Sequence, residues 1–292
     1  MKQKQKFCCA IALIAVIGCS IIACDNLDPI NMEMVQISAG TFTMGSQSGN
    51  SDQRPQRQVT LSAFRIGRYE VTQRQYRAVM GTNPSYFKKA VAGENAARLP
   101  VEQVSWYDAI IFCNRLSIME ELSPAYSING STNPDDWGAV PVAWNDPLCA
   151  VWDTVLIVSG STGYRLPTEA QWEYAACAGT STAYSYGDTA NGDYMWFGSN
   201  SGGITREVGK KLPNPWGLYD MHGNVWEWCW DWYGTYPSRA ETNPSGAVSG
   251  SNRVVRGGGW YDSTTLTRSA YRGSSFDRDG RYGDLGFRVV RP

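Results

Sequence analysis

Residues 217–228 (GLYDMHGNVWEW) carry the side chains of this sequence that are best suited to binding a metal. Asp220 and Glu227 flank Gly223, and a tight turn at this glycine would bring the carbonyls of Gly223 and Val225 toward the two carboxylates. Two carboxylates with backbone oxygens are a ligand set that suits calcium. The spacing is not that of an EF-hand loop, so an alternative stays open, in which both acids cap turns or pair with arginines.

Other catalytic chemistry is limited by the few histidines and the spacing of the cysteines. His222 is the only histidine, and no Cys-x-x-Cys pair is present. Ordinary zinc sites and catalysis by Ser-His-Asp or Cys-His groups are therefore excluded. Four cysteines of the main domain can pair outside the cytoplasm, but two fall on core-facing helix stripes, where a free thiol is the commoner state: Cys113, Cys149, Cys177 and Cys229.

Residues 261–287 have the composition of a binding surface. They contain no Lys, Glu, Gln, Met or Trp, and these five types are the ones that no codon ending in a pyrimidine encodes. Tyr and Phe offer contact area at low entropic cost, while Ser, Gly and Asp offer adaptable hydrogen bonds. A plain surface loop is the alternative. The residues expected to contact a ligand are Gly259, Tyr261, Asp262, Ser263, Thr265, Tyr271, Ser274, Ser275, Phe276, Asp279, Arg281, Tyr282 and Asp284.

Strands are expected on both sides of this tract, at residues 253–260 and 286–290. The chain between them must leave the sheet and return, so it must run over the surface. Residues 224–228 alternate large aromatic and small or polar side chains, the pattern of a strand with one buried face. Further strands are expected at residues 34–42, 59–66 and 152–158, the last of them in a hairpin insertion at 123–163.

Three helices are predicted from their N-terminal caps. The pairs Thr72 with Gln75, Ser105 with Asp108, and Thr168 with Gln171 have the capping-box spacing or a variant of it. In the second helix, apolar residues from Trp106 onward recur at helical spacing and form one stripe. Residues 180–211 are rich in Gly, Ser and Asn and predict a long loop.

The N-terminus resembles a bacterial lipoprotein signal. Lys2, Lys4 and Lys6 precede an apolar stretch at residues 7–22 that is short for a membrane span and ends at Cys24. We expect a signal peptide at 1–23, lipidation of Cys24, a polar tether at 24–33 and a single domain at 34–292. Cleavage near Cys19, or an ordinary signal peptide with a chance cysteine, is the alternative.

The remaining composition is that of one globular domain. About 265 residues remain after the targeting segment, which suits one elaborated domain. The net charge of -1 gives no basic surface for nucleic acid, so no nucleic-acid partner is expected. Twelve tryptophans and thirty glycines indicate a loop-rich fold held together by aromatic side chains.

Six blocks in order resemble the formylglycine-generating enzyme (sulfatase-modifying factor) family. They are 40–46 (GTFTMGS), 69–72 (YEVT), 100–106 (PVEQVSW), 164–175 (YRLPTEAQWEYA), 217–228, and the pair 256–260 (RGGGW) with 286–288 (GFR). The resemblance implies an α+β fold, an elaborated C-type-lectin fold of this family's subtype. It also implies a structural calcium site at Asp220, Gly223, Val225 and Glu227.

The resemblance does not carry the family's oxidase activity across. That activity uses two cysteines after the RGG motif that hold copper, and this chain has no cysteine beyond Cys229. Asp262 stands at the first of the two positions and Thr267 near the second, and neither oxygen side chain replaces a thiolate for Cu(I). No copper is therefore expected. The matching arginines Arg268 and Arg272 are interpreted as framework residues, whereas Arg278 and Arg281 are assigned to the binding face.

The C-terminal segment also resembles the variable tract of proteins diversified by retroelements. Such elements mutate adenines in AAY codons, which matches the five missing residue types, and Gly259 stands where the family has Ser. A variable region is thus expected at about residues 253–291.

The favoured function is a lipid-anchored, non-catalytic protein of the bacterial membrane, at the outer membrane or cell surface, that binds a protein or surface ligand. The alternatives are an oxidase and a structural or secretion-associated lipoprotein.

Overall fold

The structure, a computed structural model, describes residues 30–292. The predicted signal peptide, Cys24 and the first part of the tether lie outside the described residues. The chain divides into a unit of residues 1–31 and a unit of residues 32–292, and every helix and strand given below belongs to the second unit. No helix within residues 30–292 is long and apolar enough to cross a membrane.

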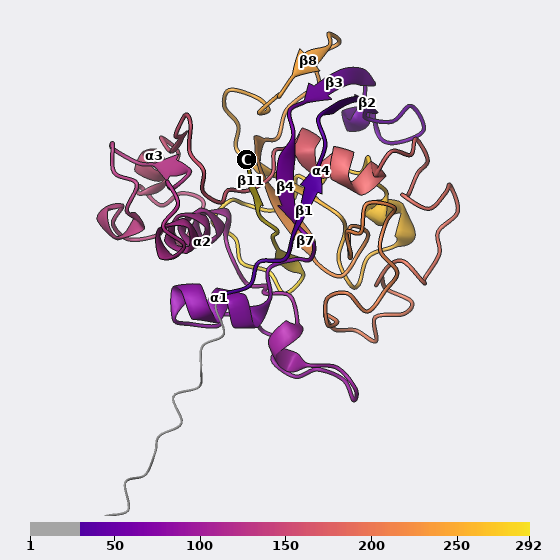
Figure 1. Cartoon of the computed structure of the whole chain (residues 1–292), viewed down its shortest axis with the longest axis horizontal. Helices are drawn as coiled ribbons and strands as arrows, with labels where there is room; N and C mark the ends of the chain where they lie inside the picture. The colour runs from indigo at the N-terminus through magenta and orange to yellow at the C-terminus, as the bar shows by residue number, and fades with distance from the viewer. Residues whose placement is uncertain (1–29) are drawn as a thin grey trace, which may run out of the picture. The chain divides into compact units, whose positions relative to one another are not determined.

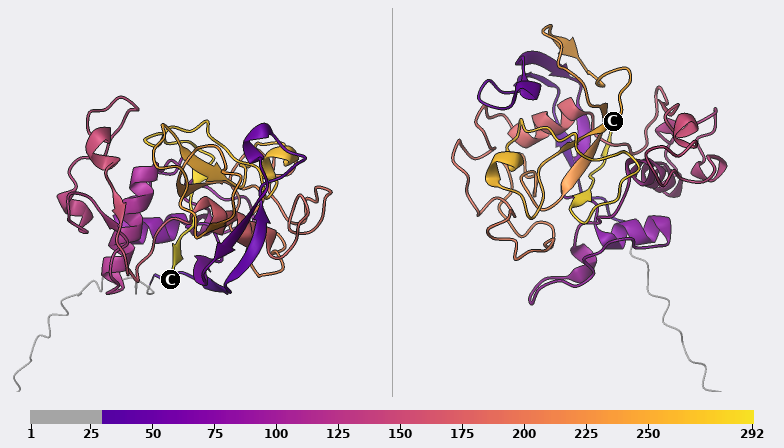
Figure 2. Two further views of the ribbon diagram at one scale, coloured as in Figure 1. Left: turned by 90° about the horizontal axis from the view of Figure 1, so that it is seen from above. Right: turned by 180° about the vertical axis from the view of Figure 1, so that it is seen from behind.

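Short strands of the second unit form three three-stranded sheets, in the orders β1-β4-β11, β2-β3-β8 and β10-β7-β9, and a two-stranded sheet of β5 and β6 (Figures 1 and 2). Helices pack around these sheets, and long loops join them. The strands are β1 Met34–Ile37, β2 Gly40–Met44, β3 Arg57–Leu61, β4 Phe64–Gly67, β5 Tyr126–Ser127, β6 Leu156–Ile157, β7 Trp226–Trp232, β8 Glu241–Thr242, β9 Arg253–Arg256, β10 Leu285–Gly286 and β11 Val290–Arg291. The helices are α1 Gln73–Met80, α2 Trp106–Met119, α3 Cys149–Trp152 and α4 Glu169–Cys177, and the 3-10 turns are η1 Ser51–Gln53, η2 Ala96–Arg98, η3 Pro134–Asp136 and η4 Thr264–Thr267.

The N-terminal hairpin corrects two predicted strands. The strands expected at 34–42 and 59–66 are each broken into two, β1 with β2 and β3 with β4. The breaks face each other, because Ile37 pairs with Phe64 and Gly40 with Leu61. At the break, the Ser62 N–H donates to Asn243 Oδ1 rather than to a neighbouring strand. Both arms of the hairpin therefore pass from one sheet into another at the same level.

The three predicted helix starts are confirmed by their hydrogen bonds. Thr72, Ser105 and Thr168 each accept a bond from the backbone three residues later and receive one in return, so α1, α2 and α4 all begin with a capping box. Such caps satisfy N–H groups that have no partner within the helix. Residues 180–211 contain no helix or strand, as the predicted loop requires.

The insertion at 123–163 differs in detail from its prediction. Strands β5 and β6 pair antiparallel, so a hairpin-like pair is present. The strand expected at 152–158 is wrong over most of its length, because Trp152 ends α3 and only Leu156–Ile157 is extended. The indole of Trp152 donates to Ala139 O, and its ring packs between Trp137 of the insertion and Tyr107 of α2.

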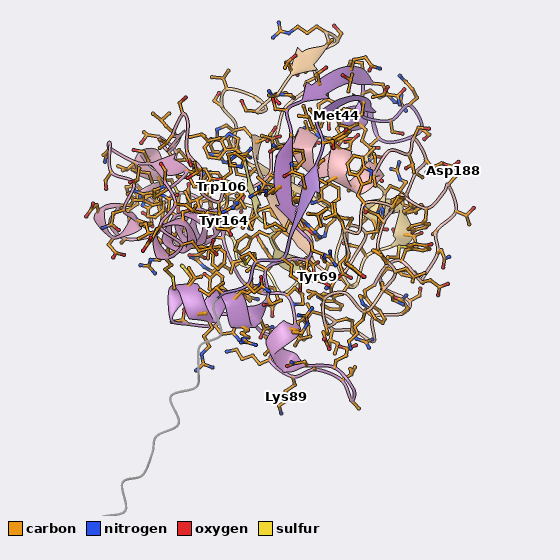
Figure 3. All side chains as sticks on the ribbon, in the orientation of Figure 1. Met44, Tyr69, Lys89, Trp106, Tyr164 and Asp188 are labelled. Carbon is orange, nitrogen blue, oxygen red and sulfur yellow. The ribbon has the colours of Figure 1, made fainter. Side chains whose placement is uncertain are left out.

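Strand β7 is buried on both faces, which corrects the prediction of one buried face. Trp226, Glu227, Trp228 and Cys229 are all buried. The indole of Trp228 donates to Val104 O, and Glu227 accepts hydrogen bonds from Trp172 and Arg288. The aromatic core extends to Trp106, which lies in the interior, whereas Lys89 and Asp188 lie at the periphery (Figure 3). The four cysteines of the domain are free thiols: Cys113, Cys149, Cys177 and Cys229.

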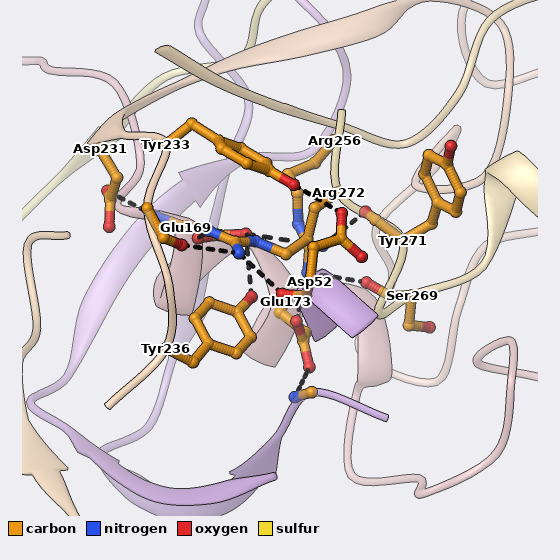
Figure 4. Close-up of polar contacts among 12 residues, drawn as sticks. Asp52, Glu169, Glu173, Asp231, Tyr233, Tyr236, Arg256, Ser269, Tyr271 and Arg272 are labelled. Atoms are coloured by element: carbon orange, nitrogen blue, oxygen red, sulfur yellow. Dashed lines mark hydrogen bonds and ion pairs between the residues drawn. The ribbon is translucent and has the colours of Figure 1, made fainter. Parts of the chain in front are cut away.

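Buried ion pairs fasten the C-terminal segment to the rest of the domain. Arg256 pairs with Glu173 and lies 3.8 Å from Glu169. Arg272 binds both carboxylate oxygens of Glu169, and α4 carries both glutamates (Figure 4). Although burial opposes ionisation, Arg272 and Arg256 hold the pKa of Glu169 below its usual value. Arg288 binds Glu227 in the same way, with the side chains of both residues at 0% exposure.

Replacing Arg272 by Met should lower the free energy of unfolding by about 3–5 kcal/mol, because Glu169 would stay buried with its main charge partner removed. Urea unfolding followed by tryptophan fluorescence measures this loss. Arg239→Met is the control, because the Arg239 side chain is 81% exposed and its distance of 3.9 Å from Glu241 is long for an ion pair. A loss for Arg272→Met no larger than that of the control would show that the pair does not hold the segment.

Candidate functional site

The chain between β9 and β10 runs over the surface of β7 and β9. Apart from η4 it contains no helix or strand, and two isolated bridges fix its path, Asn252 with Asp277 and Val255 with Gly273. Glycine is needed at position 273, because a Cβ there would lie 2.5 Å from Val255. The segment is therefore held by its backbone, and its side chains are distributed over both of its faces.

Two groups of aromatic rings lie along this segment. Trp226 of β7 has its ring centre 5.9 Å from those of Tyr271 and Phe276, and Phe276 is 4.9 Å from Tyr282. In the second group, Trp260 contacts Tyr261 at 5.1 Å and Phe87 at 5.3 Å. Tyr261 is 54% exposed, so this ring is available for contact.

The predicted ligand residues fall into three sets. Tyr261, Ser263, Thr265 and Ser275 are exposed. Tyr271, Ser274, Phe276, Arg281 and Tyr282 are half-buried. Gly259, Asp262, Asp279 and Asp284 are buried, which departs from the expectation of a continuous exposed face. Asp262 turns inward to accept from the Gly259 N–H at 2.8 Å, whereas Asp279 and Asp284 each keep one buried oxygen without a partner.

Three of the four arginines in residues 261–287 form internal ion pairs. Arg272 is the framework residue that the sequence predicted, whereas Arg268 is half-buried and donates to Thr265 O. Arg281 binds both oxygens of Asp108 in α2, and Arg278 binds Asp153 just after α3. The expectation that Arg278 and Arg281 reach a ligand is thus not matched by their positions. They hold the loop against the helices instead.

Several residues beside the segment were not among those predicted. Glu102 is fully buried and accepts from the Phe87 N–H at 2.8 Å, and burial raises its pKa to about 7. Phe87, Trp226 and Trp260 supply rings to the same face. Glu102 lies in the 100–106 block and Trp226 in the 217–228 block, so both belonged to patterns that the sequence had marked. Their closeness to the C-terminal segment is a long-range contact that no local pattern reveals.

The turn at Asp220–Glu227 offers part of the predicted calcium site. Asp220 is buried, its Oδ2 accepts from the Gly209 N–H, and its Oδ1 has no partner. Burial raises the pKa of Asp220 to about 6. The N–H groups of Gly223 and Val225 bond to Gly257 O and Glu70, so the turn is held through its donors and not through the carbonyls of these two residues.

Glu227 fits a calcium site less simply, because both of its oxygens accept from Arg288. This pairing agrees with the alternative that the spacing had left open. Burial, followed by the charges of Asp220 and Glu227, raises the pKa of Glu70, so three buried carboxylates surround Arg288. Within residues 30–292 no group of three or more His, Cys, Asp or Glu side chains has metal-ligand geometry. A cation here would bind the free Asp220 oxygen and draw on backbone carbonyls.

The positions that correspond to the family's catalytic cysteines are occupied and packed. Asp262 is bonded to Gly259, and Thr267 is fully buried and donates to Thr264 O. Neither residue provides the soft sulfur ligand that Cu(I) requires. The arrangement is suited to binding through aromatic rings and carboxylates.

The fold and this site define a C-type-lectin domain of the formylglycine-generating-enzyme type. The chain belongs to that family, since residues 26–292 match the sulfatase-modifying factor enzyme 1-like domain. The chaperone protein LppX of Paenibacillus barcinonensis is 38% identical and covers 98% of this chain and 99% of its own length. The formylglycine-generating enzyme of Thermomonospora curvata is 31% identical over 77% of this chain and 81% of its own.

The structural comparison gives a close neighbour as well. Treponema denticola variable protein 1 superposes with a TM-score of 0.79 at 40% identity, over 89% of this chain and 95% of that one. The family and the fold class predicted from the sequence, α+β, loop-rich and single-domain, are confirmed. Lipidation, calcium and the ligand residues stay predictions.

If calcium binds at Asp220, adding it should raise the melting temperature, by an amount equivalent to about 2.7 kcal/mol at a hundredfold excess over the dissociation constant. Asp220→Asn should abolish the rise, because it removes the carboxylate of this turn that has an unpartnered oxygen. Asp193→Asn, which changes an exposed carboxylate, should leave it intact. Melting curves with calcium or chelator test this, and equal curves for the unchanged protein would contradict it.

Proposed function

We propose that this chain is a lipid-anchored, non-catalytic protein that binds its ligand through the C-terminal segment. The observation that carries the proposal is that some residues of the segment fasten it to the core, while others are exposed. Arg256, Arg272 and Arg288 fasten it through buried ion pairs. Tyr261, Ser275 and their exposed neighbours lie between these fixed points. Side chains on the exposed side can therefore change without loss of the fold, which suits a site for variable ligands.

The composition of the segment supports diversification. All residue types in 261–287 can be encoded by codons ending in a pyrimidine, and the relative from Treponema denticola bears the name of a variable protein. Sequencing the locus tests this directly. We expect a near-repeat of the coding DNA for about residues 253–291 that differs only at adenines, with a reverse-transcriptase gene nearby. A locus without such a repeat would remove diversification and leave a fixed binding site.

An oxidase function is not supported by the residues present. The family's chemistry requires a cysteine pair after the RGG motif, and the chain has Asp262 and Thr267 at or near those positions. Failure to convert a cysteine-containing sulfatase peptide would agree with the binding proposal. Turnover of that peptide would overturn it.

A structural or secretion-associated role is the second candidate. The relative LppX carries the name of a chaperone protein, and it matches nearly the whole chain. The insertion also exposes apolar side chains, with Val142 at 74%, Trp144 at 69% and Leu156 at 68% exposure. Chaperone action would depend on this surface, so loss of function in Trp144→Ser, but not in variants of the C-terminal segment, would favour the second candidate.

Replacing Tyr261, Ser263, Thr265 and Ser275 together by Ala should abolish ligand capture while leaving stability nearly unchanged. Each change affects an exposed side chain, for which a cost within about 0.5 kcal/mol is typical. The measurement compares urea unfolding with the set of cell-surface proteins retained by the immobilised chain. Lys89→Ala with Asp188→Ala, at exposed positions elsewhere, serves as the control. If the fourfold variant and the control retain the same proteins, the segment is not the binding site.

Cys24→Ala should move the protein from the detergent phase to the aqueous phase on phase partitioning, because Cys24 ends the apolar stretch in a small-residue context. Cys19→Ala should leave the partitioning unchanged. Retention of Cys24→Ala in the detergent phase would place the membrane attachment elsewhere.

A further inference from the structure

Three carboxylates meet beneath the C-terminal face, from distant parts of the chain. Glu102 precedes α2, Asp262 follows β9, and Asp284 precedes β10; they are 0%, 7% and 5% exposed. One oxygen of Glu102 and one of Asp262 accept backbone N–H bonds. Glu102 Oε2 and Asp284 Oδ2 are buried and have no hydrogen-bond partner. A buried carboxylate oxygen without a donor is costly, so this arrangement calls for a partner that supplies one.

Both unpartnered oxygens face glycines. A Cβ at Gly283 would lie 3.9 Å from Glu102 Oε2, and a Cβ at Gly259 would lie 3.4 Å from Asp284 Oδ2. The two glycines themselves thus present no side chain to these oxygens, and the rings of Trp226 and Phe87 and the amide of Gln103 border the same positions.

No cation of the chain neutralises these acids within the described residues. The nearby arginines are used elsewhere, Arg278 by Asp153 and Arg281 by Asp108. Lys88 acts on Glu102 through its charge only, is exposed, and forms no ion pair with it. Burial, together with Asp262, raises the pKa of Asp284 to about 6. These carboxylates therefore have no paired cation, and a cation that entered would favour their ionised forms.

Aromatic rings surround the cluster and decide which cation suits it. Tyr261 lies next to Asp284 and Asp262, and burial with these two charges raises its pKa to about 12. Trp226 lies 3.2 Å from the position of a Gly259 Cβ, and Phe87 lies 3.6 Å from that of a Gly283 Cβ. Ring faces attract organic cations, whereas calcium requires six to eight oxygens. The surroundings favour an alkylammonium or guanidinium group over a metal ion.

We propose that Glu102 and Asp284, with Tyr261 over them, form a subsite for the basic side chain of a lysine or arginine on a protein ligand. Asp262 adds charge at the edge of this subsite. Tyr261 has 54% of its surface exposed, contacts Trp260 and is hydrogen-bonded to Asp284, so an entering cation would replace the phenol as the partner of Asp284. This inference rests on the proposed function and names the ligand chemistry for one part of the binding face.

The test uses the full chain in detergent with small probes. N-acetylarginine amide and N-acetyllysine amide represent the two basic side chains, and N-acetylcitrulline amide is the neutral counterpart of arginine. Saturation-transfer NMR measures their dissociation constants. At least one basic probe should bind about tenfold more tightly than the citrulline probe, a difference of about 1.4 kcal/mol. Glu102→Gln and Asp284→Asn should each weaken that binding about tenfold, while Asp277→Asn, at an exposed acid of the same segment, should not.

Equal binding of the citrulline probe, or no binding of either basic probe, overturns the inference, and so does unchanged binding in Glu102→Gln and Asp284→Asn. Calcium binding that is lost in Asp284→Asn, with no binding of the basic probes, would also overturn it and assign a metal site instead. If either variant fails to fold by urea unfolding, the contrast between the arginine and citrulline probes on the unchanged protein decides. Retained ligand capture in the unchanged protein, lost in the fourfold alanine variant, would leave the proposed function standing even when the probes fail.

Discussion

The structure depends on the buried pairing of arginines from the C-terminal segment with glutamates of the core. A buried charge is tolerated only when a partner and hydrogen bonds compensate its loss of hydration. Arg256 and Arg272 find both in α4, and Arg288 finds them in β7. The three arginines are separated by stretches without regular secondary structure, so the pairs fix the path of a segment whose few strand residues cannot fix it alone. The exposed side chains between these arginines are therefore not needed to hold the segment in place.

Strand β7 connects this framework to the binding face. Alternate residues of a strand point to opposite sides, and here both sides are covered. Glu227 points toward Arg288 and Trp172, while Trp226 points toward Tyr271 and Phe276 of the C-terminal segment. The same strand therefore holds the segment by charge on one side and supports its aromatic rings on the other. Residues 217–228, which in the sequence suggest a metal-binding turn followed by a strand, thus lie beneath the C-terminal segment and support it.

The parts of the fold that the sequence predicted are those determined by neighbours in the chain. The helices beginning after Thr72, Ser105 and Thr168 were predictable, because a capping box is a contact over three residues. The broken strands were not, because the break at Ser62 is caused by Asn243, a residue far along the chain. The same limit applies to the site. Composition marked the C-terminal segment, but whether Asp284 turns inward depends on its surroundings, including Glu102 and Gly259, and no periodicity in a Gly-rich loop encodes that direction.

The position of Asp262 shows what the loss of the cysteine pair changes in this scaffold. A catalytic thiolate must be accessible and must remain ionised, whereas Asp262 is buried, and that burial raises its pKa. Its carboxylate accepts a hydrogen bond from the Gly259 N–H and lies beside Trp226, so it stabilises the turn after β9. The turn then presents Tyr261 to solvent, and Asp284 Oδ2 lies buried nearby without a hydrogen-bond partner. Asp262 therefore has a structural role in this turn, next to an aromatic and acidic surface.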